Sequence, residues 1–412
     1  LSAHAFAAPK CPSDNAGLTL PDGFCALVAA DVRVAGQATL VRHLLVAPNG
    51  DVLAALRAPS SGATKSGGFV ALRDTDNNGT LDKQAHFGAG HSGAGIALFE
   101  GYVYLGLHDA VIRFPWDEAK MTAGKEETVV SGLHRRGGWH SDKTIVITPS
   151  GSLLVNIGVP SNACETARDN PKGQEPCPHL EKSGGIWEFD ARKTGQVQSD
   201  GKRIVTGLRH MLALTLQPGS TRLYGVQNGR DVLHQSWPKL YSAADGDKKP
   251  AEEMMHLKRG EDYGWPHCYF DRELQTKVLG PEYGGDGKKA GLCAEKSTPI
   301  LGFPGHWAPI AIAFDEGRQF PAAYRGGAFV SFHGSWNRSP SNHGGYNVAF
   351  VPFHGQLPSG DYSVFADGFA GEHKNPGAAA HRPTGLAFAR DGSLYVGEDK
   401  AGRIYRVLYK SN

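Results

Sequence analysis

The feature that most constrains the fold is a strand–turn–strand unit that recurs along the chain. Each copy has a short apolar run, a turn rich in Pro, Asn, Asp or Gly, and a second apolar run. Short runs bounded by turn residues indicate β-strands, and a unit that cannot bury both of its faces alone must stack on its neighbours. The copies begin at Arg42, Gly93, His140, Arg209, Ala308 and Arg382.

Six copies predict an all-β fold, a six-bladed β-propeller of four-stranded antiparallel blades that forms a single domain over residues 1–412. The early run 23–32 is expected to complete the last blade, and segment 1–10 to be a mature start or a boundary left by a removed domain. A propeller of seven or eight blades and a tandem of β-sandwiches are the alternatives. Candidate outer strands follow most copies, at 67–74, 110–116, 184–191, 346–353 and 402–409.

Charge and hydropathy exclude two classes of partner. The chain has 43 Lys and Arg against 41 Asp and Glu, whereas nucleic-acid-binding domains are usually strongly basic. No apolar run approaches the ~20 residues that a membrane span needs. We therefore expect neither a nucleic-acid nor a membrane partner.

The six cysteines bear on location. Many pairings are open, but the short spacings favour Cys11 with Cys25, Cys164 with Cys177, and Cys268 with Cys293. An even number of cysteines that close loops is typical of secreted proteins. The sequon at Asn78 agrees with an extracellular glycoprotein.

Basic side chains stand where several copies begin, and the innermost strands of a propeller line its central channel. They include Arg42, His140, Arg209, His210 and Arg382. A ring of Arg and His at one end of a channel predicts a pocket for a small polyanion. The insert "HGSWNRS" (333–339) is expected to leave an innermost strand and to overhang the same pocket.

Several long motifs, in one order, resemble the soluble quinoprotein sugar dehydrogenases (the glucose/sorbosone dehydrogenase family), and within it the fungal pyranose dehydrogenases that use pyrroloquinoline quinone (PQQ). The resemblance extends over all six copies. It implies PQQ and Ca²⁺ as cofactors and a pyranose sugar as substrate. The motifs are "GGWHSDKT" (137–144), "GLRH" (207–210), "NGRD" (228–231), "PAEEMMHLKRGEDYGWPHCY" (250–269), "HGSWNRS" (333–339) and the segment 381–407.

The resemblance implies that His140 is the catalytic base. A neutral imidazole would take the proton of the sugar C1 hydroxyl while the C1 hydride passes to the quinone C5 of PQQ. Bacterial relatives of the glucose type carry an Asp near this histidine, where the present chain has Val159. Any acid that orients His140 must therefore come from elsewhere, and glucose is expected to be a poor substrate.

The resemblance also implies a set of cofactor-binding residues, since PQQ has three carboxylates. Trp336 would stack on the flat ring system, and Asn337 would hydrogen-bond its edge, so we expect no glycan at that second sequon. Lys143 stands where relatives often have Arg. The expected set is Arg42, Lys143, Arg209, His210, His333, Trp336, Asn337, Arg338 and Arg382.

Two calcium sites follow from the resemblance. The catalytic Ca²⁺ would bind the main-chain carbonyls of Gly229 and Arg230 and bridge to PQQ. The oxygen-rich loop 74–82 opens like an EF-hand but lacks its final acid, and is expected to be a plain turn. A structural Ca²⁺ would bind Glu252, Glu253, Asp271 and the carbonyl of Tyr263, a solvated acidic edge being the alternative.

The leading hypothesis is thus a secreted PQQ- and Ca²⁺-dependent dehydrogenase of pyranose sugars. Its electrons would pass to a soluble acceptor or to a b-type cytochrome (haem) domain. The alternatives are a calcium-dependent sugar lactonase, which would need carboxylates and amides at the inner strand starts, and a non-catalytic carbohydrate- or protein-binding propeller.

Overall fold

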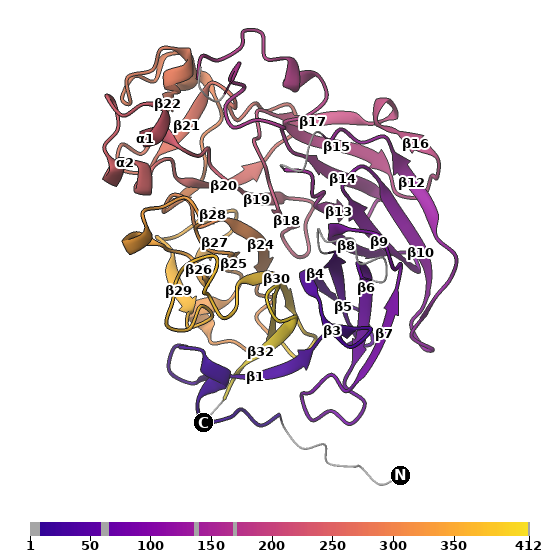
Figure 1. Cartoon of the computed structure of the whole chain (residues 1–412). Coiled ribbons are helices and arrows are strands. Elements are labelled where there is room, and N and C mark those ends of the chain that lie inside the picture. Colours follow the sequence, from indigo (N-terminus) through magenta and orange to yellow (C-terminus); the bar gives the residue numbers. More distant parts are fainter. Residues whose placement is uncertain (1–8, 59–65, 136–139, 168–170, 411–412) are drawn as a thin grey trace.

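Six β-sheets are arranged around a central axis, and each forms one blade of a propeller (Figure 1). The computed structural model describes residues 9–58, 66–135, 140–167 and 171–410. Most of the predicted boundary at 1–10 and the first three residues of "GGWH" lie outside the described residues. The prediction of a six-bladed propeller with four-stranded antiparallel blades is confirmed.

The inner two strands of each blade are the strand–turn–strand unit of the sequence. The innermost strands are β4 (Leu40–Val46), β8 (Gly93–Phe99), β13 (Ile145–Ile147), β18 (Ala213–Leu216), β24 (Pro309–Phe314) and β30 (Pro383–Phe388). Their partners are β5 (Val52–Arg57), β9 (Tyr102–Leu107), β14 (Ser152–Ile157), β19 (Leu223–Gln227), β25 (Ala328–Phe332) and β31 (Leu394–Glu398).

The segments predicted as outer strands prove to be third strands, because one more strand lies outside each. The third strands are β6 (Gly68–Arg73), β10 (Val111–Asp117), β15 (Gly185–Asp190), β20 (Glu252–Leu257), β26 (Asn347–Val351) and β32 (Arg403–Tyr409). The fourth are β7 (Lys83–Phe87), β12 (Glu127–Ser131), β17 (Lys202–Thr206), β23 (Leu301–Phe303), β29 (Ser363–Ala366) and β1 (Phe24–Asp31). Of these six strands the sequence predicted only β1, because less regular sequence and varied connections hid the other five from pattern reading.

Several shorter strands and helices lie outside the four-stranded pattern of the blades. In the second blade, β11 (Thr122–Ala123) pairs with β10, and β16 (Gln196–Val197) runs parallel to β12. Two small hairpins are β2 (Arg33–Val34) with β3 (Gln37–Ala38), and β27 (Phe353–His354) with β28 (Leu357–Pro358). The long insertion 231–307 carries α1 (Leu233–Ser236), α2 (Ala243–Lys248) and the hairpin β21 (Cys268–Asp271) and β22 (Thr276–Leu279).

The ring is closed by the two ends of the described chain, as predicted. Strand β1 pairs antiparallel with β32, from Phe24 opposite Tyr409 to Asp31 opposite Arg403. Blades also approach closely at the axis. A Cβ on Gly385 of β30 would meet the Arg42 carbonyl at 2.3 Å, so only glycine fits between these innermost strands.

Apolar side chains fill the spaces between blades, because strands that face neighbours on both sides carry near-continuous hydrophobic runs. Between the last two blades, Phe24 packs edge-on against Phe320 and Phe365, with ring centroids 4.9 and 5.0 Å apart. Burial of such rings is worth about 1.5–3 kcal/mol each. This packing makes the blades a rigid support for the loops at the channel entrance.

Three disulfides join Cys11 to Cys25, Cys164 to Cys177, and Cys268 to Cys293, which confirms the predicted pairing. Among the described residues, no helix has the length and apolar character to cross a membrane. The "HGSWNRS" insert follows the second strand β25, and not an innermost strand as predicted. Because Phe332 pairs opposite Pro309, the insert still emerges at the end where β24 begins.

Candidate active site

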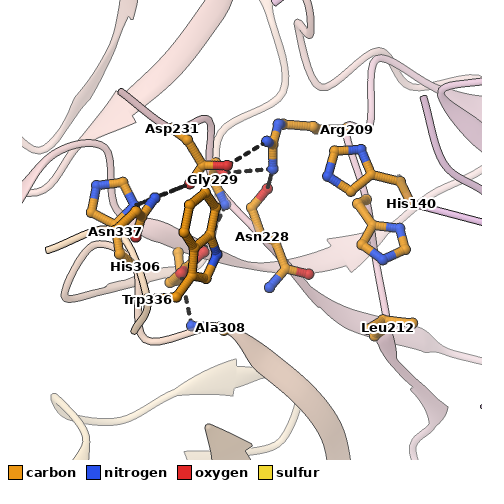
Figure 2. A pocket seen from close by; sticks show the side chains of 12 residues that line it. His140, Arg209, Leu212, Asn228, Gly229, Asp231, His306, Ala308, Trp336 and Asn337 are labelled. Carbon is orange, nitrogen blue, oxygen red and sulfur yellow. Dashed lines mark hydrogen bonds and ion pairs between the residues drawn. The ribbon is translucent and has the colours of Figure 1, made fainter. Parts of the chain in front are cut away.

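A cavity of about 470 Å³ lies at the end of the channel where the innermost strands begin (Figure 2). Loops before β13, β18 and β24 and loops after β19 and β25 supply its walls. Seven residues of the predicted sites line it: His140, Arg209, His210, Gly229, Glu252, Trp336 and Asn337. The cavity also contains His306, the basic residue just before the fifth copy that was expected to line the pocket, and four residues that the sequence prediction did not include: Leu212, Asn228, Asp231 and Ala308.

His140 adopts a left-handed backbone conformation, with φ of 53°, which non-glycine residues rarely adopt outside functional sites. Its Nδ1 lies 2.7 Å from the carbonyl oxygen of Val159. A carbonyl only accepts hydrogen bonds, so Nδ1 carries the hydrogen of the neutral ring. The main chain of Val159 thereby orients the ring. It takes the place of the acid that was expected to orient His140 and that the nearby sequence lacks.

Electrostatics keep the His140 ring neutral. Loss of water contact and then the charge of Arg209 lower the pKa of His140 to about 3. Its ring stacks on His210, with centroids 4.7 Å apart. Burial also lowers the pKa of His210 well below its ordinary value, and the buried His210 Nδ1 has no hydrogen-bond partner among the described residues.

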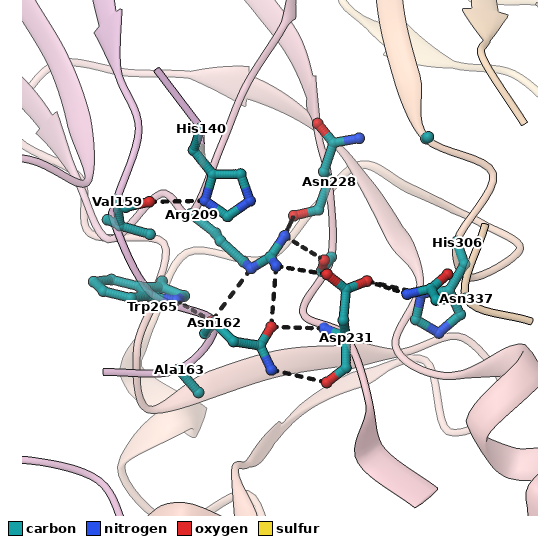
Figure 3. A network of polar contacts seen from close by, with 12 residues as sticks. His140, Val159, Asn162, Ala163, Arg209, Asn228, Asp231, Trp265, His306 and Asn337 are labelled. Atoms are coloured by element: carbon teal, nitrogen blue, oxygen red, sulfur yellow. Dashed lines mark hydrogen bonds and ion pairs between the residues drawn. The ribbon is translucent and has the colours of Figure 1, made fainter. Parts of the chain in front are cut away.

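Arg209 is held by a network of polar contacts on one side of the cavity (Figure 3). Its Nη2 donates to Asp231 Oδ2 at 2.8 Å and to Asn162 Oδ1 at 3.0 Å. Its Nη1 donates to the Gly229 carbonyl at 2.8 Å. These partners lie in two segments of the chain, at Asn162 and at 229–231, so the guanidinium is fixed in position with its charge beside the cavity.

Asp231 is the centre of that network. Burial alone would raise its pKa, but Arg209 and then His306 hold the pKa of Asp231 far below its usual range. Asn337 Nδ2 donates to the second carboxylate oxygen, and His306 Nδ1 lies 3.4 Å from it. Burial would lower the pKa of His306, yet its contact with Asp231 raises that pKa.

Glu252 ties two loops of the cavity together. Its Oε2 accepts from the backbone N–H of Gly229 at 2.6 Å, and its Oε1 from that of Ala308 at 3.0 Å. Burial raises the pKa of Glu252 to about 7. Glu252 therefore fixes the turn whose carbonyls the sequence suggested as calcium ligands.

The four predicted ligands of a structural calcium are not brought together. Glu253 pairs with Lys277 Nζ at 2.8 Å, and the same ammonium donates to the Tyr263 carbonyl. Asp271 instead pairs with Lys249, at 2.9 Å. Among the described residues, no group of three or more His, Cys, Asp or Glu side chains is arranged to hold a metal ion. A lysine is thus the cation that neutralises Glu253.

Several predicted cofactor ligands belong to a second buried cluster that does not line the cavity. Arg42 lies between two carboxylates, with Asp399 at 2.9 Å and Asp142 at 3.5 Å. Asp399 also accepts from His333, at 2.8 Å, and Asp142 contacts His108, at 3.0 Å. These side chains are hydrogen-bonded within the protein, because acids from the start of one strand and the end of another meet them.

The remaining predicted cations also lie outside the cavity lining. Arg382 donates to the carbonyls of His333 and Gly334, at 2.9 and 2.8 Å. Lys143 is fully buried, donates to the Ser141 carbonyl at 2.7 Å, and burial lowers its pKa to about 8. Burial also lowers the pKa of Arg338. The side chain of Arg230 points away from the cavity and pairs with Glu282.

Asp231 and Asn162 are two functional candidates that sequence reasoning missed. Asp231 stood in the "NGRD" motif, where only Gly229 and Arg230 were given roles, and Asn162 follows Val159 by three residues. Their contact joins loops 69 residues apart, with Asp231 N donating to Asn162 Oδ1 at 2.7 Å. No local pattern reports such a contact.

Comparison with known proteins agrees with this architecture. The pyrroloquinoline quinone-dependent pyranose dehydrogenase of Coprinopsis cinerea is 25% identical over 435 aligned residues, which cover 95% of this chain and 52% of that protein. The chain therefore spans about half the length of that curated relative.

Solved structures show the same fold. The holo form of the pyranose dehydrogenase PQQ domain from Coprinopsis cinerea superposes with a TM-score of 0.75 at 20% identity, covering 97% of this chain and 99% of that one. The calcium structure of a Trichoderma reesei enzyme of carbohydrate-active family AA12 gives 0.76 at 19% identity, with 95% and 97% covered. The family model described as TrAA12-like matches residues 32–410, and the chain belongs to that family.

Proposed function

We propose that this chain is the catalytic propeller of a PQQ-dependent oxidoreductase that oxidises the C1 hydroxyl of pyranose sugars. The observation that carries the proposal is His140, a neutral imidazole oriented by Val159 and directed at a cavity that a sugar could enter. The curated relative from Coprinopsis cinerea is named for this activity, which supports the reaction class.

His140 would act as general base. With the ring hydrogen on Nδ1, the lone pair is on Nε2, and this atom would take the proton of the C1 hydroxyl. The depressed pKa of His140, about 3, means that the imidazole needs no deprotonation before it reacts. Arg209 is the nearest charge that keeps it neutral.

The cavity has features that fit a flat, polar, anionic cofactor. Two buried polar atoms in its lining, His210 Nδ1 and Asn228 Oδ1, have no hydrogen-bond partner among the described residues. The Trp336 side chain is 53% exposed, unusual for so large an apolar group, and a planar ring system would cover it. Arg209 supplies positive charge for a carboxylate.

PQQ would therefore be held by Arg209, His210, Asn228 and Trp336, and Ca²⁺ by the Gly229 and Arg230 carbonyls beside the carboxylates of Asp231 and Glu252. When bound, PQQ supplies the hydride acceptor and Ca²⁺ polarises it. Arg42 and Arg382 do not line this cavity, so we assign them to the frame of the site.

The electron acceptor and the location belong to the same proposal. Since the chain spans about half of its curated relative, a further domain such as a b-type cytochrome is one candidate acceptor, and a soluble acceptor is the other. Three disulfides support an extracellular location.

Reconstitution tests the proposal. The metal-free protein is mixed with PQQ and Ca²⁺, given a panel of pyranoses, and followed by reduction of an artificial dye. We expect turnover that needs both additions, and a loss of about 10²–10⁴-fold in kcat for His140→Ala with PQQ still bound. Failure to bind PQQ in the presence of Ca²⁺ would exclude the proposal, and lactone hydrolysis would then be assayed.

A further inference from the structure

A second cavity of about 230 Å³ adjoins the first. Asp231 and Trp336 line both cavities, so the two cavities are neighbours that share these side chains. The second cavity lies against α1 and the segment that contains Asn162. Its volume is below the ~300–1,000 Å³ of sites for drug-sized ligands, which suits one small ring.

The walls of this second cavity combine apolar and polar surfaces. Pro160, Pro171 and Val232 provide flat apolar contacts, and the indole of Trp336 provides a larger one. A sugar ring has the same two characters, with C–H groups on its faces and hydroxyls around its edge. Aromatic and apolar faces with a few placed polar groups are the usual composition of small-molecule sites.

The polar part of the wall includes a donor without a partner. Arg230 is 6% exposed and pairs with Glu282, which also accepts from Trp237 Nε1 at 3.0 Å. The buried Nε of Arg230 has no hydrogen-bond partner among the described residues. Arg230 lines the second cavity, and an unpaired buried donor favours a ligand oxygen beside it. The lining also has the carboxylates of Glu165, Asp231 and Glu282 against the one guanidinium of Arg230, which disfavours an anionic ligand and fits a neutral one.

We propose that this second cavity binds the sugar unit next to the reducing-end ring, so that reducing oligosaccharides are preferred over free monosaccharides. The inference rests on the proposed function, because the reducing-end ring would occupy the first cavity with its C1 hydroxyl at His140. The chain of sugars would then pass Trp336, which contacts both cavities, and the second ring would meet Arg230 and Ser236.

The test compares reducing hexose disaccharides of different linkage with the parent monosaccharide, using protein loaded with PQQ and Ca²⁺. We expect at least one disaccharide to have a kcat/KM about tenfold higher. In Ser236→Phe, whose new ring fills the second cavity, this ratio should fall to about one. The matched control is Gln235→Phe on the same helix, at an exposed position outside both cavities, and it should keep the wild-type ratio.

A binding measurement removes dependence on turnover and on the variant. Methyl glycosides cannot be oxidised at C1, so calorimetry with the wild-type protein compares the methyl disaccharide directly with the methyl monosaccharide. Tighter binding of the disaccharide by about tenfold supports the proposal. If the protein oxidises monosaccharides but prefers no disaccharide, either in activity or in binding, the second-ring site is overturned and the proposed function stands. Oxidation of no sugar overturns the proposed function and this inference together.

Discussion

The Nδ1 atom of His140 donates to the carbonyl of Val159 across 2.7 Å, which leaves the lone pair of the neutral ring on Nε2. Burial and Arg209 lower the pKa of His140 to about 3. In the cofactor-free protein we therefore expect the ring to stay neutral from pH 8 down to pH 5. Histidine NMR measures this directly, and His140→Gln assigns the signal. A midpoint near the ordinary value of about 6.5 would contradict the environment described.

Removal of the Asp231 carboxylate should disturb the position of Arg209. Asp231→Ala leaves a buried guanidinium without its partner, which typically destabilises a protein by about 3–5 kcal/mol. We also expect weaker PQQ binding, measured by titration of the folded variant. Asp361→Ala is the control, since Asp361 pairs with Arg272 at the exposed surface, where such pairs contribute about 0–1 kcal/mol. Equal losses in the two variants would count against a central role for Asp231.

Lys277 should matter more than any exposed lysine. Lys277→Met leaves Glu253 buried and unpaired, so we expect a decrease of about 3–5 kcal/mol in the free energy of unfolding. Denaturation with urea, extrapolated to water, gives this value. The matched variant is Lys374→Met, which breaks a half-exposed pair with Asp367 and should cost no more than about 1 kcal/mol. If Lys277→Met proved as mild as the control, another cation would have to neutralise Glu253.

The disulfide between Cys164 and Cys177 should affect the site as well as stability. Replacing both residues with Ala should cost about 3 kcal/mol, as expected for loops of this size. It also frees the segment with Asn162, whose side chain holds Arg209 at 3.0 Å, so PQQ affinity should fall. Removing the disulfide between Cys11 and Cys25 should decrease stability by a similar amount. It should not change the PQQ affinity, because this disulfide tethers β1, the outermost strand of the last blade. Calorimetric unfolding and PQQ titration together separate the two effects.

The sequence predicted what is periodic or local. The six blades, the closure by β1 and the disulfides follow from alternating apolar runs, turn residues and short cysteine spacings. His140 was placed at the channel because it precedes an innermost strand. What the sequence could not show is which acids meet which cations, since Asp399 reaches Arg42 across 357 residues.

Arg42 and His333 illustrate that limit. Both were predicted to bind an external anion, and in the structure the carboxylate of Asp399 contacts both of them. Lys277 lies in a short strand, where a lysine normally indicates a solvated face, yet it is buried, with its ammonium on Glu253 of β20 and on the Tyr263 carbonyl. Such contacts depend on three-dimensional packing, and the spacing of residues along the sequence does not predict them.

The pairing of β1 with β32 has a consequence for biosynthesis. A ribosome adds about 5–20 residues each second, so a residue 357 positions downstream of Arg42 is made roughly 20–70 seconds later. Throughout that interval the first blade has no neighbour on one face, β1 has no strand to pair with, and Arg42 lacks the carboxylate of Asp399. The unpaired edge of β1 and the apolar face of the first blade are therefore exposed to other chains until β32 has been made.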